Sequence, residues 1–414
     1  MIRIRERFSN DILNEFSSKA INYTIGKFKR ERASLSTLED KYSLWRFASN
    51  SNISRLATLD PSLLENEIEK INRLYPEVAE YYDVKRYFSP AIALKVNKLS
   101  IDGQVDKQIF DENCNILLSV VSSLRNNFTC LSLINHIIEE VQHVVDELSA
   151  LPLTEARTSY KDRIGTLYGL MSGKNIDDFF PPWIPLIGKV FNYKGFVDQS
   201  FAIRITNDLA IKVCPYCNIE GIKPDDYENK NGQRVYRPPL DHYFPKSIYP
   251  FLSISIYNLV PCCSKCNTTY KLDYDTYHNK YKNPYLSGFC SNIFFEIENH
   301  EELLVELEYG RIDEGEINVR CTIDEYLGET KDIFRIRTRY TEDDTWLDRA
   351  KQVLDSFSYS GNGTTFVIGT KTVNQDEYIS YLTELDLRKS ALERAGKKYK
   401  IDLVNQVYGS EYKV

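Results

Sequence analysis

The sequence predicts an α+β protein, with a mostly helical N-terminal region, a central cysteine-rich module and a C-terminal region of mixed strands and helices. Three observations predict this class. Apolar residues recur at helical spacing before residue 198, two C-x-x-C pairs lie between residues 214 and 266, and alternating residues followed by helical patterns occupy the part after residue 291. A chain of 414 residues is long enough for two or three domains. We therefore expect domains at 1–197, 198–290 and 291–414.

The N-terminal region has clear signals for helices. Asp60 and Pro61 form an N-cap followed by a proline at the first helical position, and an apolar stripe follows. Residues 130–150 repeat apolar side chains every three or four positions, which predicts a long helix. The segment Phe179-Phe180-Pro181-Pro182-Trp183 is a proline break and a plausible boundary.

The C-terminal region mixes the two periodicities. Residues 198–212 predict a short helix that leads into Cys214. Residues 292–325 predict strands, including the apolar segments 294–297 and 303–305. Helical patterns return at 342–357 and 376–396, and a Ser-Gly-Asn-Gly turn signal at 360–363 separates them.

Charge is distributed unevenly. The net charge is −7, which by itself argues against a nucleic-acid binder, yet residues 211–290 carry 10 Lys or Arg and 7 Asp or Glu. A basic island in an acidic chain is compatible with local phosphate contact. It also suggests that a partner supplies part of the contacts that bind nucleic acid.

No apolar run approaches the roughly 18 residues of a membrane span, and the charged start Met1–Arg7 has no apolar stretch after it. We therefore expect a cytoplasmic protein that does not contact a membrane. In a reducing cytosol, paired cysteines indicate metal binding and not disulfides. Of the other cysteines, we expect Cys114, Cys130, Cys290 and Cys321 to be buried small hydrophobes, and Cys262 is ambiguous.

The paired cysteines predict a structural zinc site. Cys214 and Cys217 form one C-x-x-C pair, and Cys263 and Cys266 form the other. Four thiolates complete a tetrahedral zinc site and leave no open position for catalysis. The gap of 45 residues between the pairs is longer than in a simple zinc ribbon, so it must contain further structure.

Chemistry-bearing residues lie inside this gap and just after it. Asp241 and Asn267 offer oxygen ligands for Mg²⁺, and the neighbouring His242 has a pKa range suited to a general base. Asn258 would fix a loop through hydrogen bonds to the backbone. Lys271 follows Asn267 by one helical turn, so we expect it to face the same phosphate. Adjacent strand residues point to opposite sides, so a bend is needed for Asp241 and His242 to share one centre.

These residues, in this order, resemble the HNH endonucleases of the ββα-metal class. The resemblance implies a zinc-stapled ββα-metal HNH module, in which two strands and a helix form the site. It further implies that His242 is the base, that Asp241 and Asn267 hold Mg²⁺ or Mn²⁺, and that Asn258 stabilises the loop. The last His of the family name is replaced by Asn267 here.

A finer resemblance involves residues 241–250 (DHYFPKSIYP), residues 257–261 (YNLVP) and Asn283-Pro284-Tyr285. This pattern is similar to HNH nucleases of bacterial anti-phage systems of the Septu and retron type. That resemblance implies an ATPase or another defence-system subunit as a partner.

Three functions are therefore open at this point. The first is a metal-dependent endonuclease that hydrolyses phosphodiester bonds in DNA, as the effector of an anti-phage system. The second is a zinc-containing subunit that binds nucleic acid or acts as a scaffold without cutting. The third is an RNase with the same site, because these residues do not distinguish DNA from RNA.

Overall fold

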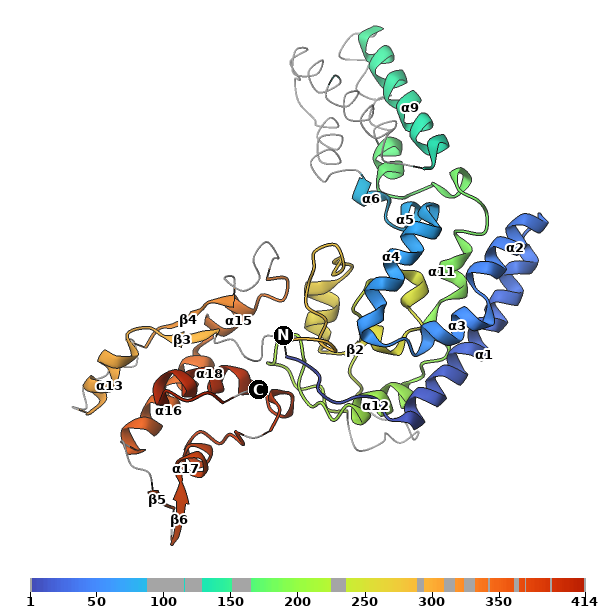
Figure 1. The fold of residues 1–414 in the computed structure, drawn as a ribbon. Coiled ribbons are helices and arrows are strands. Elements are labelled where there is room, and N and C mark those ends of the chain that lie inside the picture. Colours follow the sequence, from blue (N-terminus) through green and yellow to red (C-terminus); the bar gives the residue numbers. More distant parts are fainter. Residues whose placement is uncertain are drawn as a thin grey trace. The chain divides into compact units, whose positions relative to one another are not determined.

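The computed structural model describes residues 2–87, 115, 129–150, 165–224, 236–288, 294–308, 317–323, 332–341, 343–360, 365–368, 370–387 and 389–412 (Figure 1). The chain forms two compact units. We call Met1–Phe16, Phe196–Tyr243 and Ile256–Val414 the cysteine unit, and Ser17–Gly195 with Phe244–Ser255 the helical unit. Each unit combines segments that are distant in the sequence. The domain limits at 197 and 290 remain predictions.

Among the residues that the structure describes, the regular elements of the helical unit are helices (Figure 1). They are α1 (Asn10–Ser34, which starts in the cysteine unit), α2 (Leu38–Phe47), α3 (Asn50–Ala57), η1 (Pro61–Leu63), α4 (Leu64–Leu74), α5 (Pro76–Tyr82), α6 (Val84–Tyr87), α9 (Leu131–Ala150), η2 (Asp177–Phe179), α11 (Leu186–Val190), η3 (Tyr193–Gly195) and η4 (Pro250–Leu252). The Asp60 side chain accepts a hydrogen bond from the Ser62 N–H, which confirms the predicted cap. The predicted helix at 130–150 is confirmed as α9.

Aromatic packing forms the centre of the helical unit. The ring of Phe47 lies between 5.1 and 6.2 Å, centroid to centroid, from the rings of Tyr75, Trp183, Phe191 and Phe251. Aromatic pairs at such distances stabilise a core beyond their buried area. The segment 244–255 is fixed to this unit because Ser253 donates a hydrogen bond to the Phe191 carbonyl.

In its described residues the cysteine unit has three small antiparallel strand pairs, which join β1 (Leu240–His242) to β2 (Leu259–Pro261), β3 (Phe295–Ile297) to β4 (Val319–Cys321), and β5 (Thr365–Ile368) to β6 (Lys371–Asn374). Its other elements are α12 (Gln199–Asp208), η5 (Ile256–Asn258), η6 (Lys265–Lys271), α13 (His300–Glu308), α15 (Ile336–Thr341), α16 (Asp344–Ser360), α17 (Gln375–Leu382), η8 (Ala391–Glu393) and α18 (Lys397–Tyr408). The α+β class is therefore confirmed.

Helix α18 is the core element of the C-terminal part and contacts β3 and α16 (Figure 1). Tyr399 on α18 is fully buried, and its ring lies 4.9 to 5.5 Å from those of Phe295, Tyr340 and Trp346. Charged residues are also buried on this helix, where Lys398 pairs with Asp402 one turn later. The helix therefore combines an aromatic contact with an internal ion pair.

Two expectations for the C-terminal region are wrong. The segment 303–305 lies in helix α13 and not in a strand, because a short continuous apolar run fits either structure and only its tertiary partners decide. The predicted helix at 376–396 ends at Leu382, and a separate short turn at Ala391–Glu393 follows. The helix predicted at 342–357 is confirmed as α16. Part of the turn signal at 360–363 lies outside the described residues.

Cys130, Cys262 and Cys321 are buried and form no disulfide with another described cysteine, whereas Cys114 and Cys290 lie outside the described residues. Among the described residues, none of the helices has the length and apolar composition that crossing a bilayer requires.

Candidate functional site

The first C-x-x-C pair lies on a tight hairpin loop after α12. Val213 and Gly221 form an antiparallel bridge, and within it the Cys214 N–H donates to the Glu220 carbonyl at 2.9 Å. Asn218 has a φ of +56°, a left-handed conformation that Asn tolerates better than most residues. Its side chain donates to the Ala391 carbonyl at 2.8 Å and accepts from the Lys398 N–H at 3.0 Å, so the loop is attached to the start of α18.

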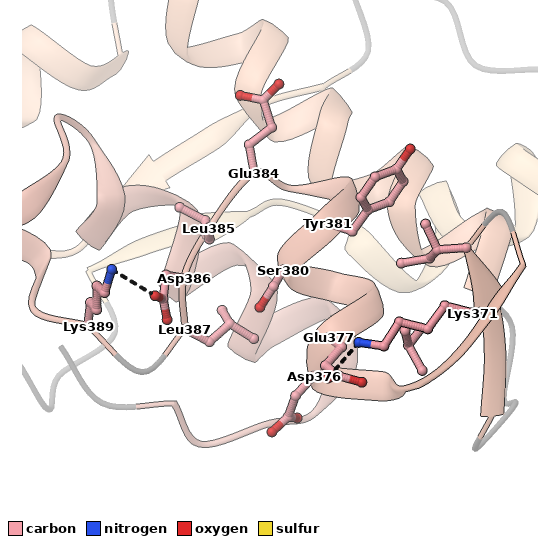
Figure 2. Close-up of a pocket in the computed structure, with 12 residues that line it drawn as sticks. Lys371, Asp376, Glu377, Ser380, Tyr381, Glu384, Leu385, Asp386, Leu387 and Lys389 are labelled. Atoms are coloured by element: carbon pink, nitrogen blue, oxygen red, sulfur yellow. Dashed lines mark ion pairs between the residues drawn. The ribbon is translucent and has the colours of Figure 1, made fainter.

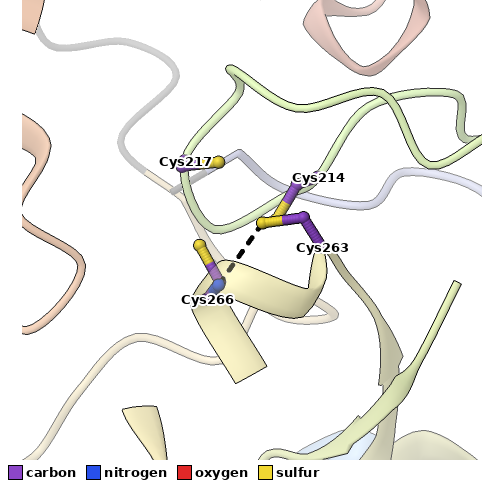
Figure 3. A group of neighbouring side chains, drawn as sticks. All are labelled: Cys214, Cys217, Cys263 and Cys266. Atoms are coloured by element: carbon purple, nitrogen blue, oxygen red, sulfur yellow. Dashed lines mark hydrogen bonds between the residues drawn. The ribbon is translucent and has the colours of Figure 1, made fainter. Parts of the chain in front are cut away.

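The two C-x-x-C pairs meet, as the sequence predicted. The Sγ atoms of Cys214, Cys217, Cys263 and Cys266 all lie within 4.8 Å of one another and are buried (Figure 3). Zn–S bonds of about 2.3 Å in a tetrahedral site are compatible with this spacing. The cluster can therefore bind a structural metal such as zinc, and the donor set fits that ion.

Backbone amides support the thiolate form of two of the sulfurs. The Ile219 N–H donates to Cys217 Sγ at 3.5 Å, and the Cys266 N–H donates to Cys263 Sγ at 3.4 Å (Figure 3). Burial raises the pKa of Cys217, but hydrogen bonds from the other three thiols outweigh this and bring the pKa well below its usual range. A hydrogen bond from Cys214 is the main reason that the pKa of Cys263 is lowered. Metal binding needs these thiolates.

A residue that sequence reasoning missed balances the charge of the cluster. Arg339 on α15 donates from Nη1 to Cys266 Sγ at 3.6 Å and pairs with Glu220 at 3.3 Å. Burial lowers the Arg339 pKa, but the Cys217 and Cys266 charges raise it above its usual value overall. The next residue, Tyr340, donates to the Cys217 carbonyl at 2.8 Å. No local signal marks these residues, because they reach the cluster only through the fold.

Strands β1 and β2 lie between the cysteine pairs in the sequence. Asp241 is opposite Val260 and His242 is opposite Leu259 in an antiparallel register. The ladder continues on both sides, since the Tyr243 N–H donates to the Asn258 carbonyl at 2.9 Å and the Cys262 N–H donates to the Pro239 carbonyl at 3.1 Å. After β2 the chain passes Cys263 and enters η6, so the order is strand, strand, helix.

Asp241 is buried and fully engaged. Its exposed fraction is 3%, its Oδ2 accepts from the Tyr216 hydroxyl at 2.6 Å, and the Lys271 ammonium lies 3.2 Å from the same oxygen and 3.3 Å from Oδ1. Burial, followed by the Asp241 charge, raises the Tyr216 pKa well above its usual value, so the phenol remains a donor. Tyr216 stacks on Phe334 at 4.5 Å.

The expectation that Lys271 would contact a phosphate is not supported by its position. Its side chain is 1% exposed, and its Nζ also donates to the His242 carbonyl at 2.6 Å. The helix is wound as a π-helix, and the Leu272 N–H donates to the Asn267 carbonyl five residues earlier. This wider winding is often found at functional sites. The buried carboxylate of Asp241 holds the Lys271 ammonium in the interior, because a single unpaired charge of either sign is unstable when buried.

The remaining predicted residues lie on β1, on η5 directly before β2, and on η6. His242 at the end of β1 is 7% exposed, and Asn258 before β2 is fully buried. Asn267 lies in the first turns of η6 and is half-buried. Its side chain has no hydrogen-bond partner among the described residues, whereas Asp241 is occupied. A divalent ion could bind Asp241 only after displacing Lys271, so the arrangement does not offer a free carboxylate for Mg²⁺.

A separate cavity of about 720 Å³ lies between β5, β6, α17 and the segment that follows α17 (Figure 2). Two ion pairs lie in its lining: Lys371 lies 3.6 Å from Glu377, and Lys389 lies 3.3 Å from Asp386 (Figure 2). Two further carboxylates, Asp376 and Glu384, also line the cavity, so its lining is acidic overall. We assign no ligand to this cavity.

Comparison of the chain with protein-family models, with characterised proteins and with solved structures found no match. The geometry of the site and the resemblance of its motifs therefore point to the function.

Proposed function

We propose that the chain is a nuclease of the HNH type that hydrolyses phosphodiester bonds in DNA. The observation that carries the proposal is the order strand, strand, helix, with Asp241 and His242 on β1, Asn267 on η6, and the four-cysteine cluster at the junction of these elements. These elements carry one imidazole and two oxygen-bearing side chains on a fixed backbone, which is the support that a catalytic site needs.

His242 is the group that we assign to proton transfer. Imidazole has an ordinary pKa near neutrality, so it can take a proton from water that attacks the phosphorus. The backbone of His242 is fixed from two sides, by pairing with Leu259 and by the Lys271 ammonium on its carbonyl. Asn258 acts through the backbone, because its carbonyl accepts the Tyr243 N–H directly after His242.

The catalytic metal of the expected mechanism does not fit the present arrangement of Asp241. A bound Mg²⁺ or Mn²⁺ would neutralise the charge that develops on the phosphate. In this structure the Lys271 ammonium takes the position of a cation beside the carboxylate. The assay below compares activity with and without an added divalent ion.

A plasmid-nicking assay tests the proposal. Wild type, His242→Ala and the matched control His143→Ala, which alters an exposed histidine on α9, are compared with added Mg²⁺, with added Mn²⁺ and with neither. Divalent ions are omitted by dialysis and not removed with EDTA, because a chelator could also remove zinc. We expect wild type and His143→Ala to nick the plasmid under the same ion condition, and His242→Ala to leave it intact. Equal nicking by His242→Ala would refute the assignment.

One observation favours a second function. The buried pair of Lys271 and Asp241 is also what a purely structural site would contain, and it suits a zinc-containing subunit that binds nucleic acid without cutting. That function predicts binding of DNA with no turnover under any metal condition. The same assay with matched DNA and RNA substrates separates the DNA nuclease and the non-cutting subunit from an RNase. Co-purification with an ATPase subunit tests the partner that the resemblance implies.

A further inference from the structure

Helix α2 has large apolar side chains on a face that the fold does not use. Leu38, Tyr42 and Trp45 are 83%, 58% and 48% exposed. Their spacing of four and three residues places them on one face, over a length of about 10 Å. The opposite face anchors the helix, since Leu44 and Phe47 are buried in the helical unit. The exposed stripe therefore contributes nothing to the core.

Two of these side chains form an aromatic pair. The Tyr42 and Trp45 rings lie 5.7 Å apart with an interplanar angle of 33°. The chain has three tryptophans, and the other two, Trp183 and Trp346, are only 7% and 4% exposed. Trp45 is consequently the indole that solvent and dissolved ligands can reach most easily.

A cation lies on each side of the stripe. At 100° per residue, Lys41 and Arg46 adjoin it on its two sides. The basic end of α1, which contains Lys29, Arg30 and Arg32, lies beside α2, because the Arg32 guanidinium donates to the Lys41 carbonyl at 3.3 Å. Within the part of the chain that the structure describes, no ion pair engages the side chains of Lys29, Arg30, Lys41 or Arg46. Residues 27–46 contain six Lys or Arg and three Asp or Glu, in a chain whose net charge is −7.

We propose that this aromatic–basic face, which consists of Leu38, Tyr42 and Trp45 with Lys41 and Arg46, binds single-stranded nucleic acid. Exposed aromatic rings stack on unpaired bases of any sequence, and cations beside them contact the phosphates. Binding of a protein, or of a second copy of the chain, would need only the apolar stripe. The unpaired cations on both sides of the stripe favour a polyanion. The inference goes beyond the proposed function, because binding here does not require that the chain cuts.

The test uses the full chain with a 12-nucleotide oligothymidylate and no added Mg²⁺. We expect quenching of the Trp45 fluorescence on binding. Each base stacked on an aromatic side chain contributes roughly a tenfold effect or more, so Tyr42→Ala with Trp45→Ala weakens the affinity at least tenfold in fluorescence anisotropy. Trp45→Phe preserves an aromatic ring and retains most of the affinity. Tyr381→Ala removes a tyrosine that is 61% exposed on α17 and serves as the matched control.

A salt titration tests the charges separately. Each phosphate contact contributes about 0.7 to the slope of log affinity against log salt for single strands. Lys41→Gln with Arg46→Gln should therefore reduce the slope by about 1.4. Lys371→Gln, at a lysine that is 73% exposed on β6, should not change it.

Two results overturn the proposal, provided that thermal unfolding shows the variants to be folded. The first is equal affinity of wild type and of the variant that lacks both rings. The second is a wild-type dimer in light scattering that the same variant converts to a monomer while oligonucleotide binding is unchanged. The second result would assign the face to another copy of the chain.

Discussion

The ammonium nitrogen of Lys271 lies 3.2 Å from Oδ2 of Asp241, and neither side chain is more than 3% exposed. The same ammonium donates to the His242 carbonyl, so one lysine connects η6 with two successive residues of β1. This relationship joins the stability of the module to the residue that we assign to proton transfer.

Loss of either partner should be costly, because it leaves a single buried charge. Lys271→Met is expected to reduce the free energy of unfolding by about 3–5 kcal/mol. Asp241→Asn combined with Lys271→Met should cost less than the two separate changes added together. Urea denaturation measures all three variants. The control Lys371→Met removes an exposed partner of Glu377 and should change stability by less than about 1 kcal/mol; additive costs in the buried pair would contradict this reading.

The four-cysteine cluster predicts one zinc ion per chain. Cys217→Ser should abolish zinc retention and unfold the module, since structural zinc binding provides about 10–16 kcal/mol in zinc-finger peptides. Metal analysis of the purified protein and circular dichroism give the two readouts. Cys321→Ala changes a buried cysteine on β4 that is outside the cluster and should retain the metal. Full zinc occupancy in Cys217→Ser would exclude the proposed ligand set.

Arg339 should tune the metal affinity without being a ligand. Its hydrogen bond to Cys266 Sγ and its positive charge stabilise the thiolates. Residues that support metal ligands in this way typically change the affinity about 10- to 100-fold. We expect a loss of that size for Arg339→Gln in a competition titration against a chromogenic zinc chelator. Arg337→Gln, at an exposed position on the same helix, should have little effect.

The position of Lys400 leads us to expect that the free energy of unfolding rises at alkaline pH. Burial is the main cause that lowers its pKa from 10.5 to about 8. Between pH 8 and pH 10.5 the unfolded chain therefore keeps a proton that the folded chain has lost, so the free energy of unfolding contributed by this group increases with pH. The increase should be on the order of 3 kcal/mol.

The measurement for Lys400 is the difference between wild type and Lys400→Met in urea unfolding from pH 7.5 to pH 10.5. Taking the difference removes the contribution of the tyrosines, which titrate in the same range. Lys400→Met loses the bond to the Thr383 carbonyl at every pH, so only the slope of the difference tests the pKa. A flat difference would show that the ammonium stays charged in the folded protein.

Local sequence signals predicted those elements that depend on local physics. Asp60 with Pro61 located the start of a helix, and the apolar repeat at 130–150 located α9, because caps and helical periodicity act over a few residues. The segment 303–305 was assigned to the wrong element because a short apolar run satisfies both periods. Its structure depends on the helix and strands that surround it.

For the site, the sequence by itself determined which thiols would gather, because two C-x-x-C pairs are a ligand set that suits a metal such as zinc. Only the tertiary structure decided where the charges lie. It directed Lys271 inward to Asp241, brought Arg339 to the cysteines from 73 residues away, and left Tyr42 and Trp45 facing solvent. The physical reason is that a buried charge is stabilised by whatever partner the fold brings within a few ångströms, and residue spacing carries no information about that partner.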